Sequence, residues 1–525
     1  MRGSGQREAG GDDPLVSAIA RAGLLGITAK QISSLISLPE EDVSARLLRL
    51  AKDDSIARVG RGLWVLKKFE TDPTSRPEFR GAPWYDNAFE REFQIKIGRR
   101  DGEIQFNPNE QRAVHRWWPY VQGFSAGFVE DTCRTYGVAP GTIVLDPFCG
   151  SGTVPVVARM LGAQGVGIDM MPIAAWVAAA KGEWDANPER FWQVAQKVVE
   201  DRTAPSVPPP FLKETASHFR ADVLGSLLRL KENIWEVREG PAKTLLKLAF
   251  ASILIDSSNL KRAPCLGYTK KLGLGAGTPF ELFIEACLKI RKDLASLAAR
   301  KEAWGPPLQI HLGSSGQIGI PEGTVDLAIT SPPYVNGMDY VTNYKLDLAW
   351  MDLIRSYEEL RELRASMVAC DNIPRATAAE HRPSSTVSAD EWVTEIGSAI
   401  DSNISMKAAY RRDDMRAIIT KYFDDLVPVI RNVHRALKPG GRFVVVNGDS
   451  FMAGAYIPGD LIFGRLAAKV GFQTEGFDVA RTRRSGQRRG FLLRESILTL
   501  RKPGPYVAPR KVRNTQPLES FFPPN

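Results

Sequence analysis

Two short segments that lie far apart in the chain carry residues whose types and spacing could do chemistry. The first, VLDPFCGSGT at residues 144–153, has the pattern of a buried strand that runs into a glycine-rich turn, which can cradle a nucleotide-like cofactor. The second, DLAITSPPYVNGMDY at residues 326–340, has the pattern of a strand that ends in a stiff loop rich in hydrogen-bond acceptors. Together they predict a cofactor and a substrate that meet at the carboxyl edge of one sheet.

The glycine-rich turn indicates the chemical character of the cofactor. Gly150 and Gly152 let the backbone bend closely around a ligand, which would face main-chain amides and a helix start near Thr153. Asp146 opens the turn, where it would repel a phosphate but attract the cationic amino group of S-adenosylmethionine. Phe148 and the lack of a G-x-G-x-x-G string also argue against NAD.

Asp169 ends the strand predicted for the segment GVGID, which follows the glycine-rich turn. In a doubly wound sheet, an acceptor at this position lies within reach of the ribose hydroxyls of a bound nucleoside. The alternative is that Asp169 only caps the end of its own strand.

The segment Ser331-Pro332-Pro333-Tyr334 has the composition needed to act on the exocyclic amine of a nucleobase. Such an amine is a weak nucleophile because its lone pair is delocalised, so acceptors on its hydrogens must favour the nucleophilic form. The Ser331 hydroxyl and the Pro332 carbonyl are such acceptors, and the prolines stiffen the loop. Tyr334 offers a face for stacking on a base flipped out of a duplex. The alternative is a plain turn, since Pro-Pro is common in loops.

The strings D-P-F-C-G-S-G-T and S-P-P-Y resemble the two motifs of exocyclic-amine DNA methyltransferases. The resemblance implies S-adenosyl-L-methionine as cofactor, double-stranded DNA as substrate and a doubly wound, Rossmann-like α/β sheet. It implies these cofactor-binding residues: Asp146, Pro147, Phe148, Gly150, Ser151, Gly152, Thr153 and Asp169. It also implies Phe128, in the upstream S-A-G-F, and Ser314, which stands at the position where relatives often carry an acidic residue that binds the cofactor adenine. It implies these catalytic residues: Ser331, Pro332, Pro333 and Tyr334.

The first residue of the catalytic loop bears on the identity of the base. Serine there resembles the cytosine-N4 members of the family, whereas aspartate is usual among adenine-N6 members. We therefore expect cytosine N4, with adenine N6, an RNA base and an inactive DNA-binding regulator as alternatives. Ring-carbon methylation needs a cysteine nucleophile, and Pro264-Cys265 lacks the expected neighbours. The cofactor loop precedes the catalytic loop, an order that differs from many S-P-P-Y relatives but leaves the folded site intact.

The pattern of the chain predicts its domain organisation. We expect a tail (1–12), a winged helix-turn-helix domain (13–68), a linker packed on the next domain (69–112), a methyltransferase domain (113–505) with a helical insertion (about 184–307), and a second tail (506–525). Residues 495–503, ESILTLRKP, are expected as an edge strand.

Three short helices and two strands around Gly60-Arg61-Gly62 suggest the winged helix. It could place Arg46 and Arg49 in a DNA groove and Arg61 on phosphates. The alternative is a protein-contact module.

The charge of the chain is modestly basic, with a formal net charge of +9 and a sequence pI near 9.2. This balance permits binding to a phosphate backbone without requiring it. Two basic stretches are further DNA-contact candidates, although a charge run is often only a solvated surface. They contribute Lys261 and Arg262 from residues 257–271, and Arg481, Arg483, Arg484, Arg488 and Arg489 from a loop expected at residues 481–490.

The five cysteines show no spacing typical of zinc sites or of a disulfide framework, so we expect no metal. No segment resembles a signal peptide or a membrane span, so we expect a cytoplasmic protein without membrane contact. A cognate restriction endonuclease or defence-system protein is a further expected partner.

Overall fold

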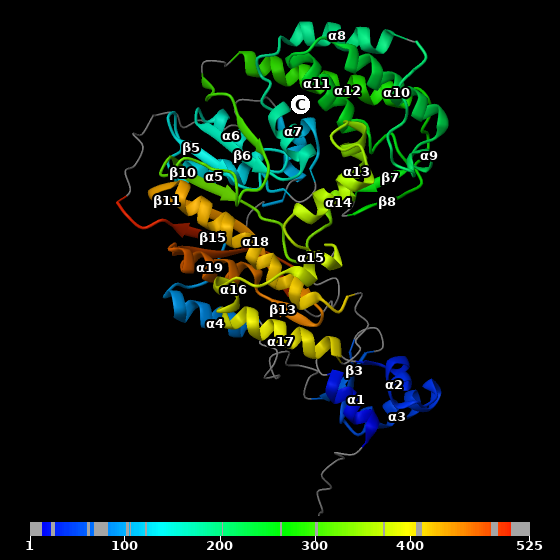
Figure 1. The fold of residues 1–525 in the computed structure, drawn as a ribbon, viewed down its shortest axis with the longest axis vertical. Helices are drawn as coiled ribbons and strands as arrows, with labels where there is room; N and C mark the ends of the chain where they lie inside the picture. Colours follow the sequence, from blue (N-terminus) through cyan, green and yellow to red (C-terminus); the bar gives the residue numbers. More distant parts are fainter. Residues whose placement is uncertain are drawn as a thin grey trace, which may run out of the picture.

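The central element of the structure, a computed structural model, is a mixed eight-stranded sheet (Figure 1). The structure describes residues 13–22, 27–59, 63–67, 82–100, 104–105, 107–120, 123–201, 203–262, 265–299, 303–370, 373–405, 412–484 and 492–505. The strands run in the order β4 (Gly98–Arg99), β14 (Gln473–Arg484), β15 (Leu492–Arg501), β11 (Leu437–Gly448), β10 (Val325–Thr330), β5 (Ile143–Asp146), β6 (Gln164–Asp169) and β9 (Gln309–Leu312).

The strands from β9 to β11 are parallel, and β15 runs antiparallel between β11 and β14. The expectation that residues 495–503 form an edge strand is therefore wrong. Strand β14 lies outside β15, and the arginines at its end gave that part of the chain the composition of a loop. A hairpin that folds back in this way places its second strand inside the sheet.

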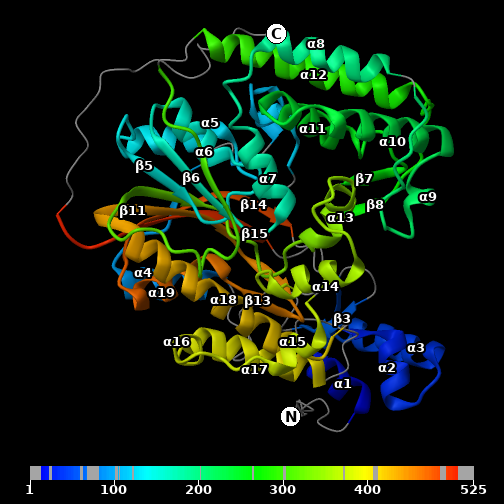
Figure 2. The ribbon, with the colours of Figure 1, turned by 45° about the horizontal axis from the view of Figure 1, so that its top comes forward.

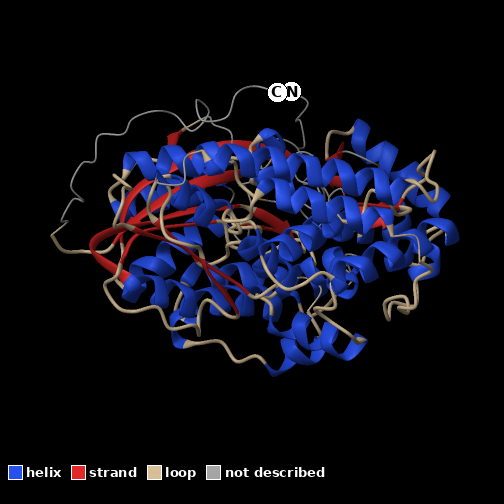
Figure 3. Ribbon diagram, turned by 90° about the horizontal axis from the view of Figure 1, so that it is seen from above, coloured by secondary structure: helices blue, strands red, loops and turns tan. Residues whose placement is uncertain are grey.

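Helices cover both faces of the sheet (Figure 3), because its strands are apolar on both sides. Successive residues alternate between two core clusters: Val144, Leu327 and Ile329 belong to one, and Leu145 and Ala328 belong to the other. The first cluster includes residues of α5 (Ala126–Thr135), α6 (Thr153–Met160), α7 (Pro172–Ala180), α13 (Tyr340–Trp350) and α14 (Tyr357–Ser366). The second includes residues of α4 (Ala82–Phe93), α15 (Arg375–Glu380), α16 (Ser385–Ser388), α17 (Glu391–Ser405), α18 (Met415–Ala436) and α19 (Gly459–Val470), and of the strands β12 (Ser450–Met452) and β13 (Ala455–Ile457).

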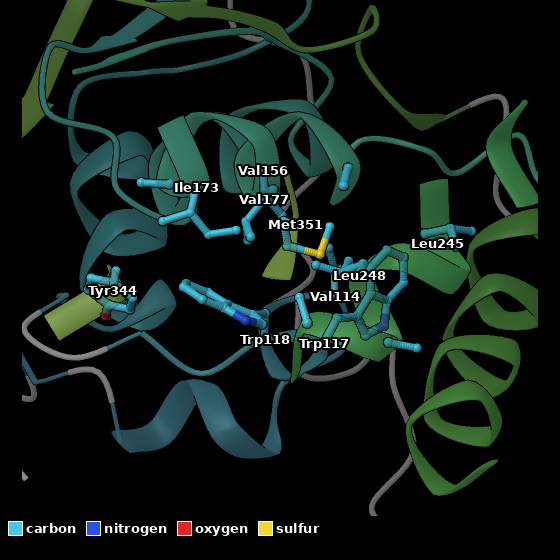
Figure 4. Packing of buried hydrophobic residues seen from close by; sticks show 14 of the residues in the cluster. Val114, Trp117, Trp118, Val156, Ile173, Val177, Leu245, Leu248, Tyr344 and Met351 are labelled. Atoms are coloured by element: carbon cyan, nitrogen blue, oxygen red, sulfur yellow. The ribbon is translucent and has the colours of Figure 1, made fainter. Parts of the chain in front are cut away.

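The stretch expected as a helical insertion packs on the first cluster. It contains α8 (Pro188–Glu200), α9 (Thr215–His218), α10 (Ala221–Glu236), α11 (Pro241–Ile253), α12 (Thr278–Ala298) and a hairpin of β7 (Leu260–Arg262) and β8 (Leu266–Tyr268). Leu245 and Leu248 of α11 share this cluster with Val156, Val177 and Trp117 (Figure 4). The insertion and the sheet therefore share one apolar core.

The N-terminal elements have a small core of their own, built around residues such as Leu15, Ile32 and Leu47. They are α1 (Pro14–Ala22), β1 (Ile27–Thr28), α2 (Ala29–Ile36), α3 (Glu40–Lys52), β2 (Ile56–Val59) and β3 (Leu63–Leu66), with the antiparallel sheet order β1-β3-β2. Figure 2 shows them at one end of the molecule. The assignment as a winged helix-turn-helix stays a prediction.

Some expectations concern residues that the structure does not describe: the tails 1–12 and 506–525, and Arg61. The segment expected as a linker, residues 69–112, contributes α4 to the second core and β4 to the edge of the sheet. None of the described helices combines the length and the apolar character that a bilayer crossing requires.

Candidate active site

The two predicted turns start from neighbouring strands. In β5 and β10, Val144 lies opposite Leu327 and Leu145 opposite Ala328, so both strands end at the same edge of the sheet. At that edge, the hydroxyl Oγ1 of Thr330 donates a hydrogen bond to Oδ1 of Asp146 at 2.7 Å. The end of β10 is thereby fixed to the start of the glycine-rich turn.

One pocket brings the residues of both turns together. Six of the predicted cofactor-binding residues line it: Asp146, Phe148, Gly150, Ser151, Thr153 and Asp169. Ser331 and Pro333 of the catalytic loop line the same pocket. Residues that are separated by almost two hundred positions in sequence therefore face a common space, as the alignment of the two strand ends requires.

Asp146 is a buried carboxylate that lines this pocket, with 2% of its surface exposed. Besides Thr330, the backbone N–H of Phe148 donates to its Oδ1 at 3.0 Å. Burial raises the pKa of Asp146 to about 7, although both hydrogen bonds favour the ionised form. A cationic group in the pocket would lower this pKa again.

Asp169 has the same character at the end of β6. Its carboxylate accepts hydrogen bonds from the backbone N–H of Gly150 and that of Met171, each at 2.8 Å. Burial raises its pKa to about 6. Asp169 thus caps its own strand, ties the glycine-rich turn to β6 and still lines the pocket.

The glycines of the turn are required by its geometry. Gly150 has a φ of +50° and Gly152 a φ of +85°, a region in which other residues are strained. A Cβ atom at Gly150 would lie 2.8 Å from the Tyr120 ring, and one at Gly152 would lie 2.9 Å from Cβ of Ala178. Any larger residue would fill the cradle or push α6 away from α7.

Four predicted cofactor residues do not line this pocket, and one of them, Gly152, is the N-cap of α6 in the glycine-rich turn. Phe128 is buried in the core beside Phe124, with ring centroids 5.7 Å apart, and Phe124 faces the pocket instead. The carbonyl of Pro147 accepts a hydrogen bond from the Ser315 hydroxyl. The carbonyl of Ser314 accepts hydrogen bonds from two backbone N–H groups in the turn after β9.

The catalytic loop also faces a larger cleft of about 820 Å³, lined by Ser331, Pro332 and Tyr334. This cleft adjoins the pocket, because Ser331 and Tyr340 line both. A hydrogen bond fixes the position of the loop, because the Tyr422 hydroxyl donates to the Pro333 carbonyl at 2.8 Å. Pocket and cleft therefore meet at the Ser331 side chain.

Tyr334 is half-buried and lines the cleft. Burial raises its pKa well above the usual value, and its side chain shares a hydrogen bond with Ser331. Gly448, at the end of β11, lets the ring approach the backbone, since a Cβ there would lie 3.2 Å from Cε2 of Tyr334. The ring and the Ser331 hydroxyl are thus positioned by the same contacts.

Sequence reasoning missed several aromatic residues of the site. Tyr120, Phe124 and Tyr340 line both the pocket and the cleft. The Tyr120 ring is stacked on that of Tyr344 at 5.5 Å, with an angle of 9° between the rings. The available signal for Tyr120 and Phe124 was the aromatic-rich string HRWWPYVQGF at residues 115–124, and Tyr340 is the last residue of the segment 326–340.

The segment that carries Tyr120 and Phe124 is anchored to the insertion. The carboxylate of Asp293, in α12, accepts hydrogen bonds from the Val114 N–H at 3.0 Å and from the Trp117 indole at 2.8 Å, and it pairs with Arg116 at 2.7 Å. Asp293 is 2% exposed. The insertion therefore helps to form a wall of the site.

The predicted basic residues are divided between the cleft and other places. Four of them line the cleft: Lys261, Arg262, Arg481 and Arg483. Arg262 is engaged in a buried ion pair with Asp347 and lies 4.2 Å from the centre of the Tyr344 ring. The cleft thus lies between the hairpins β7–β8 and β14–β15.

The remaining basic candidates are not part of this cleft. Arg46 pairs with Asp13 at 2.8 Å, and Arg49 is exposed on α3. The residues expected in a loop at 481–490 are in part strand residues, since β14 extends to Arg484. Arg488 and Arg489 lie outside the described residues.

Comparisons with known proteins agree with this arrangement. A family model described as DNA methylase, covering N6- and N4-methyltransferases, matches residues 133–178 and 325–516. These two segments contain both predicted motifs, and the gap between them spans the predicted insertion.

The chain is also similar to curated methyltransferases over most of its length. It is 25% identical to the Type II methyltransferase M.BsoBI of Geobacillus stearothermophilus, over 76% of this chain and 88% of that protein. It is 24% identical to the Type II methyltransferase M.AvaI of Nostoc sp. strain PCC 7120, over 83% of this chain and 98% of that protein. Geranyl diphosphate C-methyltransferase of Streptomyces coelicolor A3(2) aligns with 82% of this chain and 99% of its own at 9% identity, with a TM-score of 0.28, which is too low to support an inference.

The family model and the curated relatives bear out the resemblance found in the sequence: both motif-bearing segments match the N6/N4 DNA methylase model, and the chain is similar to Type II methyltransferases over most of its length.

Proposed function

We propose that this protein methylates the exocyclic amine of a base flipped out of double-stranded DNA, and that this amine is N4 of cytosine. One observation carries the proposal: Asp146 and Ser331 line one pocket, and Ser331 also lines the adjoining cleft. A methyl donor in the pocket and a base in the cleft would share a boundary at Ser331. That arrangement suits a direct transfer between them.

The residues of the pocket fit S-adenosylmethionine. Asp146 is a buried carboxylate whose raised pKa a positively charged group would lower, and the cofactor carries positive charge on its amino group and its sulfur. When bound, the cofactor supplies an electrophilic methyl group. We assign Asp146, Phe148, Gly150, Ser151 and Thr153 to its methionine half and Asp169 to its ribose, and we add Tyr120 and Phe124 as apolar walls. Gly152, the N-cap of α6, would complete the turn around the methionine half.

The catalytic loop would hold the amine of the base. In our proposal, the Ser331 hydroxyl and the Pro332 carbonyl accept hydrogen bonds from the amine, so that its lone pair is freed for attack. Tyr334 would stack on the flipped base, and the hydrogen bond from Tyr422 to Pro333 would keep the loop rigid. No step requires a nucleophilic thiol.

Two features support a DNA substrate and cytosine. Lys261 and Arg483, on opposite hairpins, give the cleft cationic walls for a phosphate backbone. Serine in the first position of the loop resembles the cytosine-N4 members of the family. The curated relatives are Type II methyltransferases, and we therefore propose a cognate restriction endonuclease or defence-system protein as partner.

Product analysis tests the proposal. The purified protein is incubated with labelled S-adenosylmethionine and with unmodified duplex DNA or transfer RNA, and the nucleosides are identified by mass spectrometry. We expect N4-methylcytosine in DNA. N6-methyladenine would correct the base, labelled transfer RNA would correct the substrate, and no labelled product in either nucleic acid would refute the proposal.

A further inference from the structure

An ion pair beside the catalytic loop has no role in the mechanism so far. Arg481 of β14 and Glu495 of β15 lie directly opposite each other across the antiparallel pair. The guanidinium donates from Nη2 to Oε1 of Glu495 at 2.7 Å and from Nε to Oε2. Both residues line the cleft, and Glu495 is 7% exposed.

This pair adjoins the Tyr334 ring. The position that a Cβ would take at Gly448 lies 3.2 Å from Cε2 of Tyr334 and 3.2 Å from Cγ of Glu495. A Cβ at Gly448 would therefore be in tight contact with both. The Arg481–Glu495 pair therefore forms part of the cleft wall beside the Tyr334 ring, and the carboxylate of Glu495 fixes the orientation of the Arg481 guanidinium.

The geometry of the pair leaves part of the guanidinium free to recognise a ligand. Arginine has five N–H donors, and the described hydrogen bonds of Arg481 use one on Nε and one on Nη2, both for Glu495. The protons that remain, on Nη1 and Nη2, form the two-pronged donor edge that binds paired acceptors. Its orientation is already fixed before a ligand enters.

Cytosine presents the matching acceptors. Next to the exocyclic amine, its Watson–Crick edge carries N3 and O2, two adjacent acceptors, whereas adenine has only N1 beside its amine. A paired donor on the wall beside Tyr334 therefore discriminates in favour of cytosine.

We propose that Arg481, oriented by Glu495, recognises the N3–O2 edge of the flipped cytosine and so determines which base is methylated. This inference rests on the proposed cytosine-N4 activity and deepens it. Arg481 is a specificity residue, and Glu495 is a positioning residue that acts through it.

The chain contains a matched ion pair for comparison. Arg442 of β11 and Glu475 of β14 form a two-bond pair in the same sheet, at 3.0 Å for each bond, and neither residue lines the cleft. A substitution there changes a strand-to-strand pair without touching the cleft.

The test compares substrates with and without the N3 acceptor. The methylated sequence is first mapped in DNA from cells that express the protein, and duplexes are made with cytosine or 3-deazacytosine at the target position. The full-length wild type, Arg481→Ala, Arg481→Lys, Glu495→Gln and the control Arg442→Lys are assayed for kcat/KM, for cofactor affinity and for Tm.

For the wild type and Arg442→Lys we expect kcat/KM to be about 10-fold or more lower on the 3-deazacytosine duplex than on the cytosine duplex. On the cytosine duplex, kcat/KM of Arg481→Ala should be lower than that of the wild type by a similar factor. Replacing cytosine by 3-deazacytosine should not lower the kcat/KM of this variant further, and its cofactor affinity should stay unchanged. Glu495→Gln, which keeps a weaker contact to Arg481, should fall between the two.

Equal penalties from 3-deazacytosine in the wild type and in Arg481→Ala would overturn the inference. If Arg481→Ala does not fold, as its Tm and cofactor binding will show, Arg481→Lys takes its place, since it keeps the charge but loses the paired donor edge. A wild type that makes no N4-methylcytosine would refute the proposed function itself. That result is distinct from equal penalties on 3-deazacytosine, which would refute only the role of Arg481.

Discussion

At the scale of single residues, the site is defined by two carboxylates that are held away from water. Asp146 and Asp169 are 2% and 8% exposed, and burial raises the pKa of each. Neither has a cationic side chain among the groups that shift its pKa. Such sites cost stability when empty and gain affinity for a cationic ligand, so they are arranged for binding.

This arrangement predicts a pH dependence of cofactor affinity. In the free protein the pKa of Asp146 is about 7, and a cationic cofactor favours the ionised carboxylate. Protonation should therefore compete with binding below about pH 7, and affinity should fall by up to about tenfold per pH unit. Asp146→Asn should bind weakly at high pH and show little of this dependence.

Calorimetric titration with S-adenosylmethionine between about pH 6 and pH 8 would measure this effect. Asp131→Asn, on the exposed side of α5, is the control and should behave like the wild type. A wild-type affinity that does not change over this range would mean that Asp146 does not face the cationic part of the cofactor.

The chemistry of these residues could be inferred from the sequence because both motifs are local. Asp146, Gly150 and Ser331 each sit in a short string whose types dictate a turn. The pairing of Arg481 with Glu495 and the stacking of Tyr120 on Tyr344 could not be inferred, because each joins segments through the sheet or the core.

At the scale of elements, the glycine-rich turn determines how closely α6 approaches α7. Gly152 is the N-cap of α6, and its missing side chain allows contact with Ala178 of α7. The backbone amides at the start of α6 therefore stay close to the pocket.

Gly152→Ala should lower stability and weaken cofactor binding. Two costs add here: about 1–2 kcal/mol for a left-handed backbone with a Cβ, and a collision at 2.9 Å with Ala178. Gly141→Ala is the matched control, since Gly141 has a φ of +89° but nothing within 4 Å of the added Cβ. Chemical denaturation should show a larger loss for Gly152→Ala, and equal losses would show that the close packing of α6 is unimportant.

Asp293→Ala should also destabilise the protein, by about 3 kcal/mol or more, because it removes the carboxylate that pairs with the partly buried Arg116 and that accepts from two buried N–H groups. Glu189→Ala breaks an exposed pair to Arg291 on the same helix, α12, and should cost less than about 1 kcal/mol. The comparison is made by urea unfolding. Similar losses for the two variants would argue against an anchoring role for Asp293.

The order of the strands could be predicted only in part. The alternation of strands and helices from residue 143 to residue 183 indicates a parallel sheet, and the structure has one there. The position of β15 inside the sheet could not be predicted, since local composition does not reveal on which side a returning hairpin strand will pair.

At the scale of the whole molecule, three core clusters divide the chain. The insertion shares one cluster with the sheet, whereas the buried residues described for the N-terminal elements form a cluster of their own. The sequence suggested a separate domain for the N-terminal elements and an insertion within the methyltransferase domain for the helices at about 184–307, but it could not show that the insertion shares its core with the sheet.

A fragment of residues 82–525 should therefore keep the cofactor affinity and the thermal stability of the main body. If the N-terminal module contacts DNA, the fragment should also bind duplex DNA more weakly and with a smaller dependence on salt. A fragment that fails to bind S-adenosylmethionine would show that the module supports the catalytic core.

The central claim is that the glycine-rich turn and the S-P-P-Y loop form one site, and labelled methyl transfer to duplex DNA by Ser331→Ala tests it most directly. We predict that this variant loses activity by on the order of 100-fold while its affinity for S-adenosylmethionine changes little. Ser388→Ala, on the short helix α16, should keep both. Transfer by Ser331→Ala at the wild-type rate would contradict the account.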